Sequence, residues 1–254
     1  MPLSAAARIL RRVSHALGFR TGADPALPPD VDPATAGTVR AVRRYTMTSE
    51  LRLVALCDAV RHVVQNRIAG DIVECGVWRG GSMMAVARTL LELGDTSRHL
   101  YLFDTYDGMT EPGDADVSIS GESAAALMRS NRKADPTSVW CYSPLAEVEA
   151  VMRSVGYPAE RIHFIEGRVE ETLPRRAPEH IALLRLDTDW YESTRHELVH
   201  LYPRLNVGGV LIVDDYGHWK GARRAVDEYL AESGAALYLQ RIDYTGRSAV
   251  KWRP

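Results

Sequence analysis

The chain has 254 residues, of which 46% are hydrophobic and 25% charged, and its formal net charge at pH 7 is −2. This fits one large α/β domain or two small ones, and it gives no electrostatic reason to expect nucleic acid or an anionic membrane as a partner. The chain has three cysteines, Cys57, Cys75 and Cys141, and none of them forms a C-x-x-C pair. This argues against a disulfide framework or a structural zinc, so we expect a cytoplasmic protein.

The first forty residues differ in character from the rest. Residues 1–20 hold four arginines and no acid, which we interpret as a basic helix packing on the domain or on a partner subunit, in preference to a transit-like or membrane-surface helix. Residues 22–38 are rich in Pro, Ala, Asp and Gly and predict a linker or extended arm, not a helix. We therefore separate a basic helix and arm, 1–40, from a single main domain, 41–254, and expect a homodimer or larger homo-oligomer.

From residue 48 the chain shows helical and then alternating patterns. A helix should begin after Thr48 or Ser49, with Arg52 largely outside its apolar stripe. Short apolar runs then alternate with helical patterns, which predicts right-handed βαβ units and a mainly parallel sheet. The runs are Asp71–Cys75, Leu100–Asp104, Ile162–Ile165, Ala182–Leu186 and Val210–Val213, and the helical patterns cover 82–93, 144–156, 191–204 and 220–233. Two last runs, Ala236–Ile242 and Ser248–Trp252, predict an antiparallel hairpin.

The interval 107–140 does not fit this rhythm. It begins with a polar, turn-rich stretch and continues with a short helical piece, Ser123–Met128, and a basic patch, Arg129–Lys133. Because it starts directly after a strand end, where α/β sheets bind ligands, we favour a lid over an ordinary surface excursion.

A glycine-rich turn, 74–82 (ECGVWRGGS), follows the first apolar run. Glycines let the backbone approach a ligand closely, and the helix start at Ser82 offers free N–H groups. The spacing is not G-x-G-x-x-G, and no Lys-Ser/Thr follows, which excludes a P-loop. Asp104, at the end of the second run, is suited to accept hydrogen bonds from both ribose hydroxyls of an adenosine. We infer a nucleoside cofactor and favour S-adenosylmethionine (SAM), because a pyrophosphate prefers a tighter glycine nest.

Two later runs end in acidic turns that should meet at one edge of a parallel sheet. Asp187 and Asp189 follow one run, and Asp214 and Asp215 follow the other. Four neighbouring carboxylates repel one another unless a cation compensates them, and oxygen donors favour Mg²⁺, Ca²⁺ or Mn²⁺ over zinc. We predict Asp187, Asp214 and Asp215 as metal ligands and Asp189 as the base for a metal-bound hydroxyl.

Structural explanations compete with these roles. Asp189 with Glu192 makes a good helix-capping pair, and Asp215 before Tyr-Gly can be a turn residue. Asp187 is harder to explain structurally, because a buried acid without a partner is costly. His218 is a candidate second base or substrate contact, although a lone loop histidine is more often neither.

At these residues the chain resembles the macrocin O-methyltransferase family, whose members methylate deoxysugar hydroxyls on glycosylated natural products. The resemblance covers about residues 45–250 and rests on DIVECGVWRGGS, LYLFDTYDGM, IEGRVEETLP, LRLDTDWYEST and LYPRLNVGGVLIVDDYG. It implies a Rossmann-like class I α/β fold with a seven-stranded, mostly parallel sheet, SAM as cofactor, and Mg²⁺ held by three aspartates. Those ligands fall on Asp187, Asp214 and Asp215, with the base on Asp189 and the cofactor acid on Asp104.

The resemblance also suggests roles for the remaining candidate residues. RYTMTSE, Arg44–Glu50, looks like the family's N-terminal lid, which implies that Tyr45 and Met47 lie near the substrate. We add Tyr191 and Trp219 as substrate contacts. The predicted cofactor residues are Glu74, Gly76, Trp78, Gly80, Ser82, Asp104, Thr105 and Asp187.

We therefore expect a SAM- and Mg²⁺-dependent O-methyltransferase of antibiotic biosynthesis, acting on a deoxysugar hydroxyl of a natural-product glycoside. The first forty residues and the 107–140 insert match the family less closely, so the acceptor stays open. One alternative is a catechol-type enzyme acting on a phenol between Trp140 and Trp219. Another is a non-catalytic SAM-binding oligomer. A nicotinamide-dependent reductase is disfavoured by the missing G-x-G-x-x-G.

Overall fold

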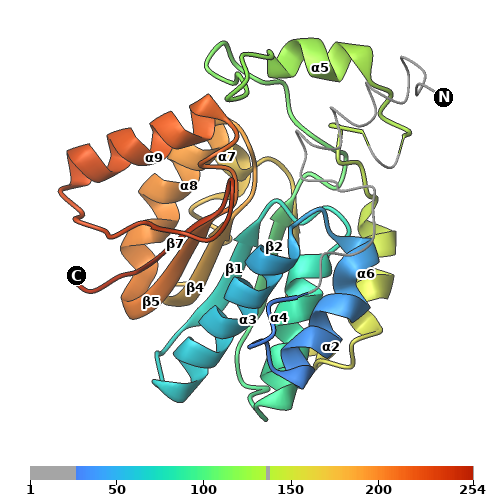
Figure 1. Cartoon of the computed structure of the whole chain (residues 1–254), viewed down its shortest axis with the longest axis vertical. Coiled ribbons are helices and arrows are strands. Elements are labelled where there is room, and N and C mark those ends of the chain that lie inside the picture. Colours follow the sequence, from blue (N-terminus) through green and yellow to red (C-terminus); the bar gives the residue numbers. More distant parts are fainter. Residues whose placement is uncertain (1–26, 136–137, 254) are drawn as a thin grey trace.

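The computed structural model describes residues 27–135 and 138–253, so the basic helix expected within residues 1–20 lies outside the described residues. A seven-stranded sheet with strand order β3-β2-β1-β4-β5-β7-β6 crosses the molecule (Figure 1). Its strands are β1 (Asp71–Cys75), β2 (Leu100–Asp104), β3 (Ile162–Glu166), β4 (Ile181–Leu186), β5 (Leu205–Val213), β6 (Gln240–Arg241) and β7 (Arg247–Val250).

The strand pairing confirms the predicted sheet. β1 to β5 pair in parallel, and β7 runs antiparallel to both β5 and β6. The hairpin is shorter than predicted, because β6 holds only two residues instead of the run Ala236–Ile242. Within that run Leu237 and Leu239 pack against the hydrophobic core, while Tyr238 is 82% exposed.

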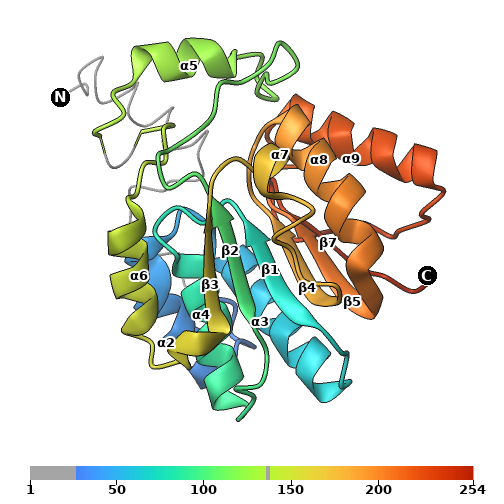
Figure 2. The same ribbon diagram turned by 180° about the vertical axis from the view of Figure 1, so that it is seen from behind.

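Helices cover both faces of the sheet (Figures 1 and 2). On one face lie α2 (Pro33–Val42), α3 (Glu50–Gln65), α4 (Gly81–Glu92) and α6 (Leu145–Arg153). On the other lie α7 (Val169–Thr172), α8 (Tyr191–Leu201) and α9 (Lys220–Ser233), while α5 (Ala124–Ser130) stands apart in the insert, beyond the carboxyl ends of the strands. Three 3-10 turns complete the described chain: η1 (Arg43–Tyr45), η2 (Ala159–Arg161) and η3 (Tyr202–Arg204).

Each face of the sheet has its own hydrophobic core. All six residues of β4 are buried, which explains why this strand is apolar throughout except for Arg185 and does not alternate between apolar and polar residues. Leu183 belongs to the core beneath α3 and α4, and Leu184 to the core beneath α8. Among the described residues, no helix is both long and apolar enough to cross a membrane.

Helix α2 corrects the prediction that residues 22–38 form no helix. Asp32 caps it, because its Oδ1 accepts hydrogen bonds from the backbone N–H groups of Ala34 and Thr35 at 3.0 Å each. Pro33 stands at the first helical position, where its missing N–H costs nothing. Four buried side chains then face α3 and α4: Thr35, Thr38, Val39 and Val42. The helix continues past residue 40, where we had placed the end of the arm.

Candidate functional site

A cavity of about 1580 Å³ lies at the carboxyl ends of the parallel strands. Single-ligand pockets are commonly about 300–1,000 Å³, so this one has room for a cofactor and an acceptor together. It brings together most of the predicted site residues: Met47, Gly76, Trp78, Ser82, Asp104, Thr105, Asp187, Asp189, Asp214, Asp215, His218 and Trp219. Four predicted residues are not among those that line it: Tyr45, Glu74, Gly80 and Tyr191.

Asp104 shapes the glycine-rich turn after β1. Its Oδ2 accepts hydrogen bonds from the backbone N–H groups of Val77 at 2.6 Å and Trp78 at 3.0 Å, and its Oδ1 accepts one from Tyr106 at 2.8 Å. Burial raises the pKa of Asp104, and these three backbone bonds oppose that rise. The carboxylate therefore fixes the glycine-rich turn, and it also lines the cavity.

Close backbone approaches explain the glycines of this turn. A Cβ on Gly76, whose φ is +83°, would lie 1.9 Å from the carbonyl oxygen of Asp187. A Cβ on Gly81 would lie 2.5 Å from the carbonyl oxygen of Tyr45. The turn thus packs directly against the acidic turn after β4 and against the segment that resembles the family's lid. In the same glycine-rich turn, the indole Nε1 of Trp78 is buried and has no hydrogen-bond partner among the described residues.

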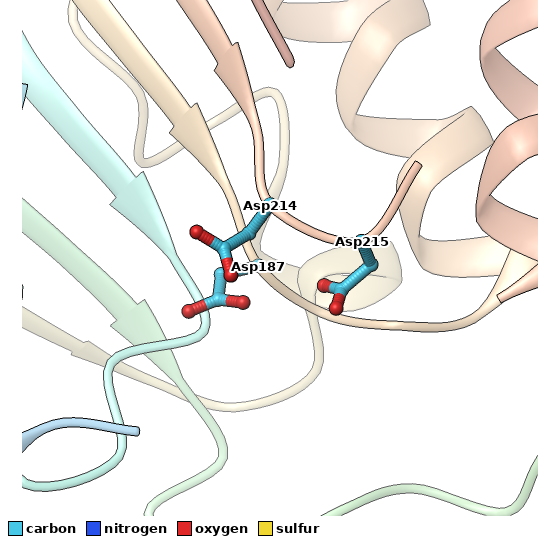
Figure 3. A group of neighbouring side chains, drawn as sticks. All are labelled: Asp187, Asp214 and Asp215. Carbon is cyan, nitrogen blue, oxygen red and sulfur yellow. The ribbon is translucent and has the colours of Figure 1, made fainter. Parts of the chain in front are cut away.

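The three predicted metal ligands form one cluster. One carboxylate oxygen from each of Asp187, Asp214 and Asp215 lies within 4.8 Å of the others (Figure 3). Asp187 and Asp214 come from neighbouring parallel strands, since Leu186 at the end of β4 pairs with Val213 at the end of β5. The register of the sheet therefore creates the cluster.

Two arginines that the sequence analysis did not assign to the site neutralise part of this charge. Arg185, only 2% exposed, donates from Nη1 to Asp187 Oδ2 at 2.7 Å and from Nη2 to Asp214 Oδ1 at 2.5 Å. Arg52 forms a second ion pair with Asp214, and it also contacts Asp243 at 3.1 Å. Arg52, which was expected largely outside the apolar stripe of this helix, is nevertheless buried at the start of α3.

Glu74 belongs to the same network below the cavity floor. It is fully buried, and its Oε1 accepts a hydrogen bond from Arg185 Nη1 at 2.7 Å, while its Oε2 has no partner among the described residues. Burial raises the pKa of Glu74 to about 8, and the Arg185 guanidinium limits the rise. Glu74 was predicted as a cofactor residue, but it does not line the cavity, and this geometry favours a role in ordering the site.

Among the described residues, no arginine forms an ion pair with Asp189 or Asp215. Asp215 Oδ2 is buried without a hydrogen-bond partner among the described residues. The two carboxyls share a hydrogen bond, and burial raises the pKa of both. This excess of oxygen donors is the chemistry that a divalent cation requires, so the residues present fit a Mg²⁺ ion.

The competing helix-cap interpretation of Asp189 is wrong in the structure. The N-cap position of α8 is Trp190, which makes no side-chain cap bond, and Asp189 has a left-handed φ of +66°. Asp116, from the insert, instead accepts the hydrogen bond of the Tyr191 backbone N–H at 2.8 Å. The sequence analysis missed Asp116, because nothing local marks it among the other acids of the insert.

Three other candidates have clear surroundings. Tyr191 is not brought to the site: its hydroxyl donates to Glu228 Oε2 at 2.6 Å, outside the cavity lining. His218 lines the cavity and contacts the Tyr244 hydroxyl at 2.9 Å, and burial together with Arg52 lowers its pKa to about 4. Trp140 donates from Nε1 to the carbonyl of Met128 at 3.1 Å and does not line the cavity, so it supplies no wall for a phenol.

Comparison with known proteins agrees with this geometry. The family described as Macrocin-O-methyltransferase (TylF) matches residues 24–253. The chain belongs to this family. The protein is therefore an O-methyltransferase, and its fold implies SAM as the methyl donor.

Two relatives are named as O-methyltransferases of natural products. The 8-demethyl-8-(2,3-dimethoxy-alpha-L-rhamnosyl)-tetracenomycin-C 4'-O-methyltransferase of Streptomyces olivaceus is 35% identical over 225 residues, which are 89% of this chain and 81% of that protein. Mycinamicin III 3''-O-methyltransferase of Micromonospora griseorubida is 34% identical over 211 residues, 82% of this chain and 78% of that protein. Among solved structures, the O-methyltransferase NovP is 28% identical with a TM-score of 0.73, covering 98% of this chain and 100% of its own. The methyltransferase CalS11, at 21% identity and a TM-score of 0.61, shares the fold.

Proposed function

We propose that this methyltransferase transfers the methyl group of SAM to a sugar hydroxyl of a natural-product glycoside, with Mg²⁺ bound by Asp187, Asp214 and Asp215. The observation that carries the proposal is the acidic cluster, which shares one cavity with the glycine-rich turn. The name of one relative, which acts on a rhamnosyl-tetracenomycin, supports the same acceptor class.

In this mechanism the chain's own groups position the reactants and move one proton. A divalent cation held by Asp187, Asp214 and Asp215 would lower the pKa of the acceptor hydroxyl and help to direct it. Asp189 accepts the hydroxyl proton as the new O–CH₃ bond forms and the S–CH₃ bond of SAM breaks. The turn held by Asp104 aligns the cofactor with the acidic cluster, and alignment of this kind supplies a large part of the rate.

The charges around the cavity favour a finished glycoside over a nucleotide-activated sugar. Three arginines are found among the described lining residues, and each is paired with a carboxylate. Arg43 contacts Glu50 at 2.7 Å, Arg168 contacts Glu170 at 3.6 Å, and Arg52 pairs as described above. A diphosphate would therefore bring two negative charges into a cavity that is already acidic, without an unpaired cation among these residues to receive it.

An acceptor comparison tests this substrate class. We expect kcat/KM for a deoxysugar glycoside with an uncharged aglycone to exceed that for the same sugar on a nucleoside diphosphate by about tenfold or more, because like charges repel. Initial rates at several salt concentrations measure the difference, and salt should narrow it. A preference for the nucleotide sugar would support instead an activity like that of CalS11, which is described as a TDP-rhamnose 3'-O-methyltransferase. Turnover of a catechol alone would support the phenol alternative.

Removal of the metal tests the ligand assignment. Chelation with EDTA, or the substitution Asp215→Asn, should lower kcat by about a thousandfold, because Lewis-acid stabilisation contributes several kcal/mol. S-adenosylhomocysteine (SAH) affinity, measured by calorimetry, should stay within about twofold of the wild type. We choose Asp215 because it pairs with neither arginine of the network, and Asp58→Asn, whose side chain is 66% exposed, is the matched control. Full activity in EDTA would show that the metal assignment is wrong.

A further inference from the structure

Asp116 is a buried carboxylate in the first part of the insert, where most residues are exposed or half-buried. It is 1% exposed, whereas Ile119 nearby is 47% exposed and Asp114 also faces solvent. Its Oδ1 accepts the hydrogen bond from the backbone N–H of Tyr191, and its Oδ2 accepts one from Gly113, each at 2.8 Å. One oxygen therefore closes a turn within the insert, and the other binds the first residue of α8.

The bond to Tyr191 supplies the cap that α8 lacks. The N–H groups at the start of a helix have no partner within the helix, and a carboxylate there also lies at the positive end of the helix dipole. Tyr191 stands two residues after Asp189, and the carbonyl of Thr188 accepts a hydrogen bond from the backbone N–H of Trp190 at 2.7 Å. Asp189 thus lies in a tight turn with a left-handed backbone conformation. This conformation is energetically unfavourable for a residue other than glycine, so contacts with the surrounding structure must stabilise it. Asp116 is one of the groups that hold it.

The same stretch of the insert is also attached to the turn that follows Asp215. Three hydrogen bonds make the attachment to the two acidic turns: Ile119 N to His218 O at 2.8 Å, Lys220 N to Val117 O at 2.9 Å, and Trp190 Nε1 to Thr110 O at 3.0 Å. Above them, residues of α5 pack with Trp190 and Trp219 in one apolar cluster. Because Leu127 and Val139 of the insert line the cavity, this attachment fixes a wall of the cavity as well.

Gly221 on α9 packs closely against the same carboxylate. A Cβ at this position would lie 2.0 Å from Asp116 Oδ1, although the backbone of Gly221 does not have the positive φ that otherwise calls for glycine. Alanine would be the better helix former here. The close approach of the carboxylate therefore explains why the second residue of α9 has no side chain.

We propose that Asp116 is a positioning residue for methyl transfer. Its carboxylate fastens the 107–140 insert to the turn that carries Asp189, so that one side chain sets both the direction of the base and the wall facing the acceptor. The link to catalysis rests on the proposed function, in which Asp189 takes the proton. The fastening itself rests on contacts of the described residues alone.

The substitution Asp116→Ala in the full-length protein tests the proposal. We expect kcat for the glycoside to fall about 10- to 100-fold with SAH affinity within twofold of the wild type. Hydrogen exchange should speed up at Tyr191 and within residues 110–120. Asp116→Asn should recover most of the activity, because an asparagine oxygen caps a helix about as well as an aspartate oxygen. The matched control is Asp114→Ala, an exposed acid two residues away, which should behave like the wild type.

The substitution Gly221→Ala tests the same contact, because the new methyl group would displace the Asp116 carboxylate. It should reproduce the loss seen in Asp116→Ala, and the double variant should be no worse than Gly221→Ala alone, because both changes break one contact. Gly37→Ala, also in a helix but with nothing within 4 Å of the new Cβ, is the control.

Different outcomes separate this proposal from the proposed function. Wild-type kcat and unchanged exchange in Asp116→Ala would overturn the positioning role, and so would a loss of SAH binding as large as the loss of turnover. A wild-type enzyme that methylates no glycoside would overturn the proposed function instead. In that case the exchange at Tyr191 in Asp116→Ala still decides whether the insert is fastened in this way.

Discussion

Replacing Asp189 with asparagine is expected to lower kcat by about 10²- to 10⁴-fold, the usual contribution of a general base. Asparagine has the same shape as aspartate and tolerates the left-handed φ of +66° at this position, so the turn should persist while the proton acceptor is lost. Steady-state kinetics with a glycoside acceptor, combined with SAH calorimetry, measure the effect. Unchanged turnover would show that Asp189 is not the base.

The pH profile gives an independent measure of the same residue. Burial raises the pKa of Asp189, and the hydrogen bond with Asp215 limits the rise. Because a base acts only when it is ionised, kcat should fall as the pH decreases through this raised pKa, and Asp189→Asn should lack that acidic limb. His218, the other predicted base, has a pKa lowered to about 4 by burial, so His218→Asn should keep the limb. Loss of the limb in His218→Asn alone would assign the base to His218.

Much of the fold follows from local patterns in the sequence. The apolar runs that became β1, β2 and β4 end where the structure ends these strands, because each run is buried on both faces and is followed by a turn. Parallel pairing then places the residues that follow β4 and β5 side by side, and this is why the metal cluster could be predicted. The helix at Pro33–Val42 does not follow from composition, because a stretch rich in Pro, Ala, Asp and Gly is typical of a linker, although Pro at the first helical position starts helices well.

The parts of the site that could not be predicted depend on partners far apart in the chain. Arg185 is one charged residue in an apolar strand, and its bonds reach back to Thr48 and Glu74 and forward to Asp214. Asp116 meets Tyr191 only because the insert folds back over α8. No periodicity in a single sequence reports such contacts, although a basic residue inside an apolar strand, two positions before an acid, is a signal worth examining.

The largest effect on stability is expected at Arg185. Replacing it with methionine should lower the free energy of unfolding by about 3–5 kcal/mol, because removing one partner of a buried ion pair leaves uncompensated charge. Glu74 would then lose its only hydrogen-bond partner among the described residues, and Asp187 and Asp214 would face each other with one cation fewer. Urea unfolding without ligands measures the loss.

A surface ion pair is the matched control for this substitution. Arg153 pairs with Glu149 one helical turn away at 2.8 Å, with its side chain 65% exposed, and Arg153→Met should change the free energy of unfolding by no more than about 0.5 kcal/mol. Equal losses in the two variants would mean that the buried network is not what makes Arg185 important.

Magnesium should partly replace the missing arginine. If Asp187, Asp214 and Asp215 hold the cation, it should bind Arg185→Met more tightly than the wild type, because the cluster has lost a competing positive charge. A ligand that binds only the folded state stabilises it according to its concentration relative to Kd, so added Mg²⁺ should narrow the difference in melting temperature between the two proteins. When Asp215→Asn is introduced into both the wild type and Arg185→Met, added Mg²⁺ should no longer narrow the difference in melting temperature. Equal stabilisation of both proteins by Mg²⁺ would show instead that the arginine and the cation act on separate groups of carboxylates.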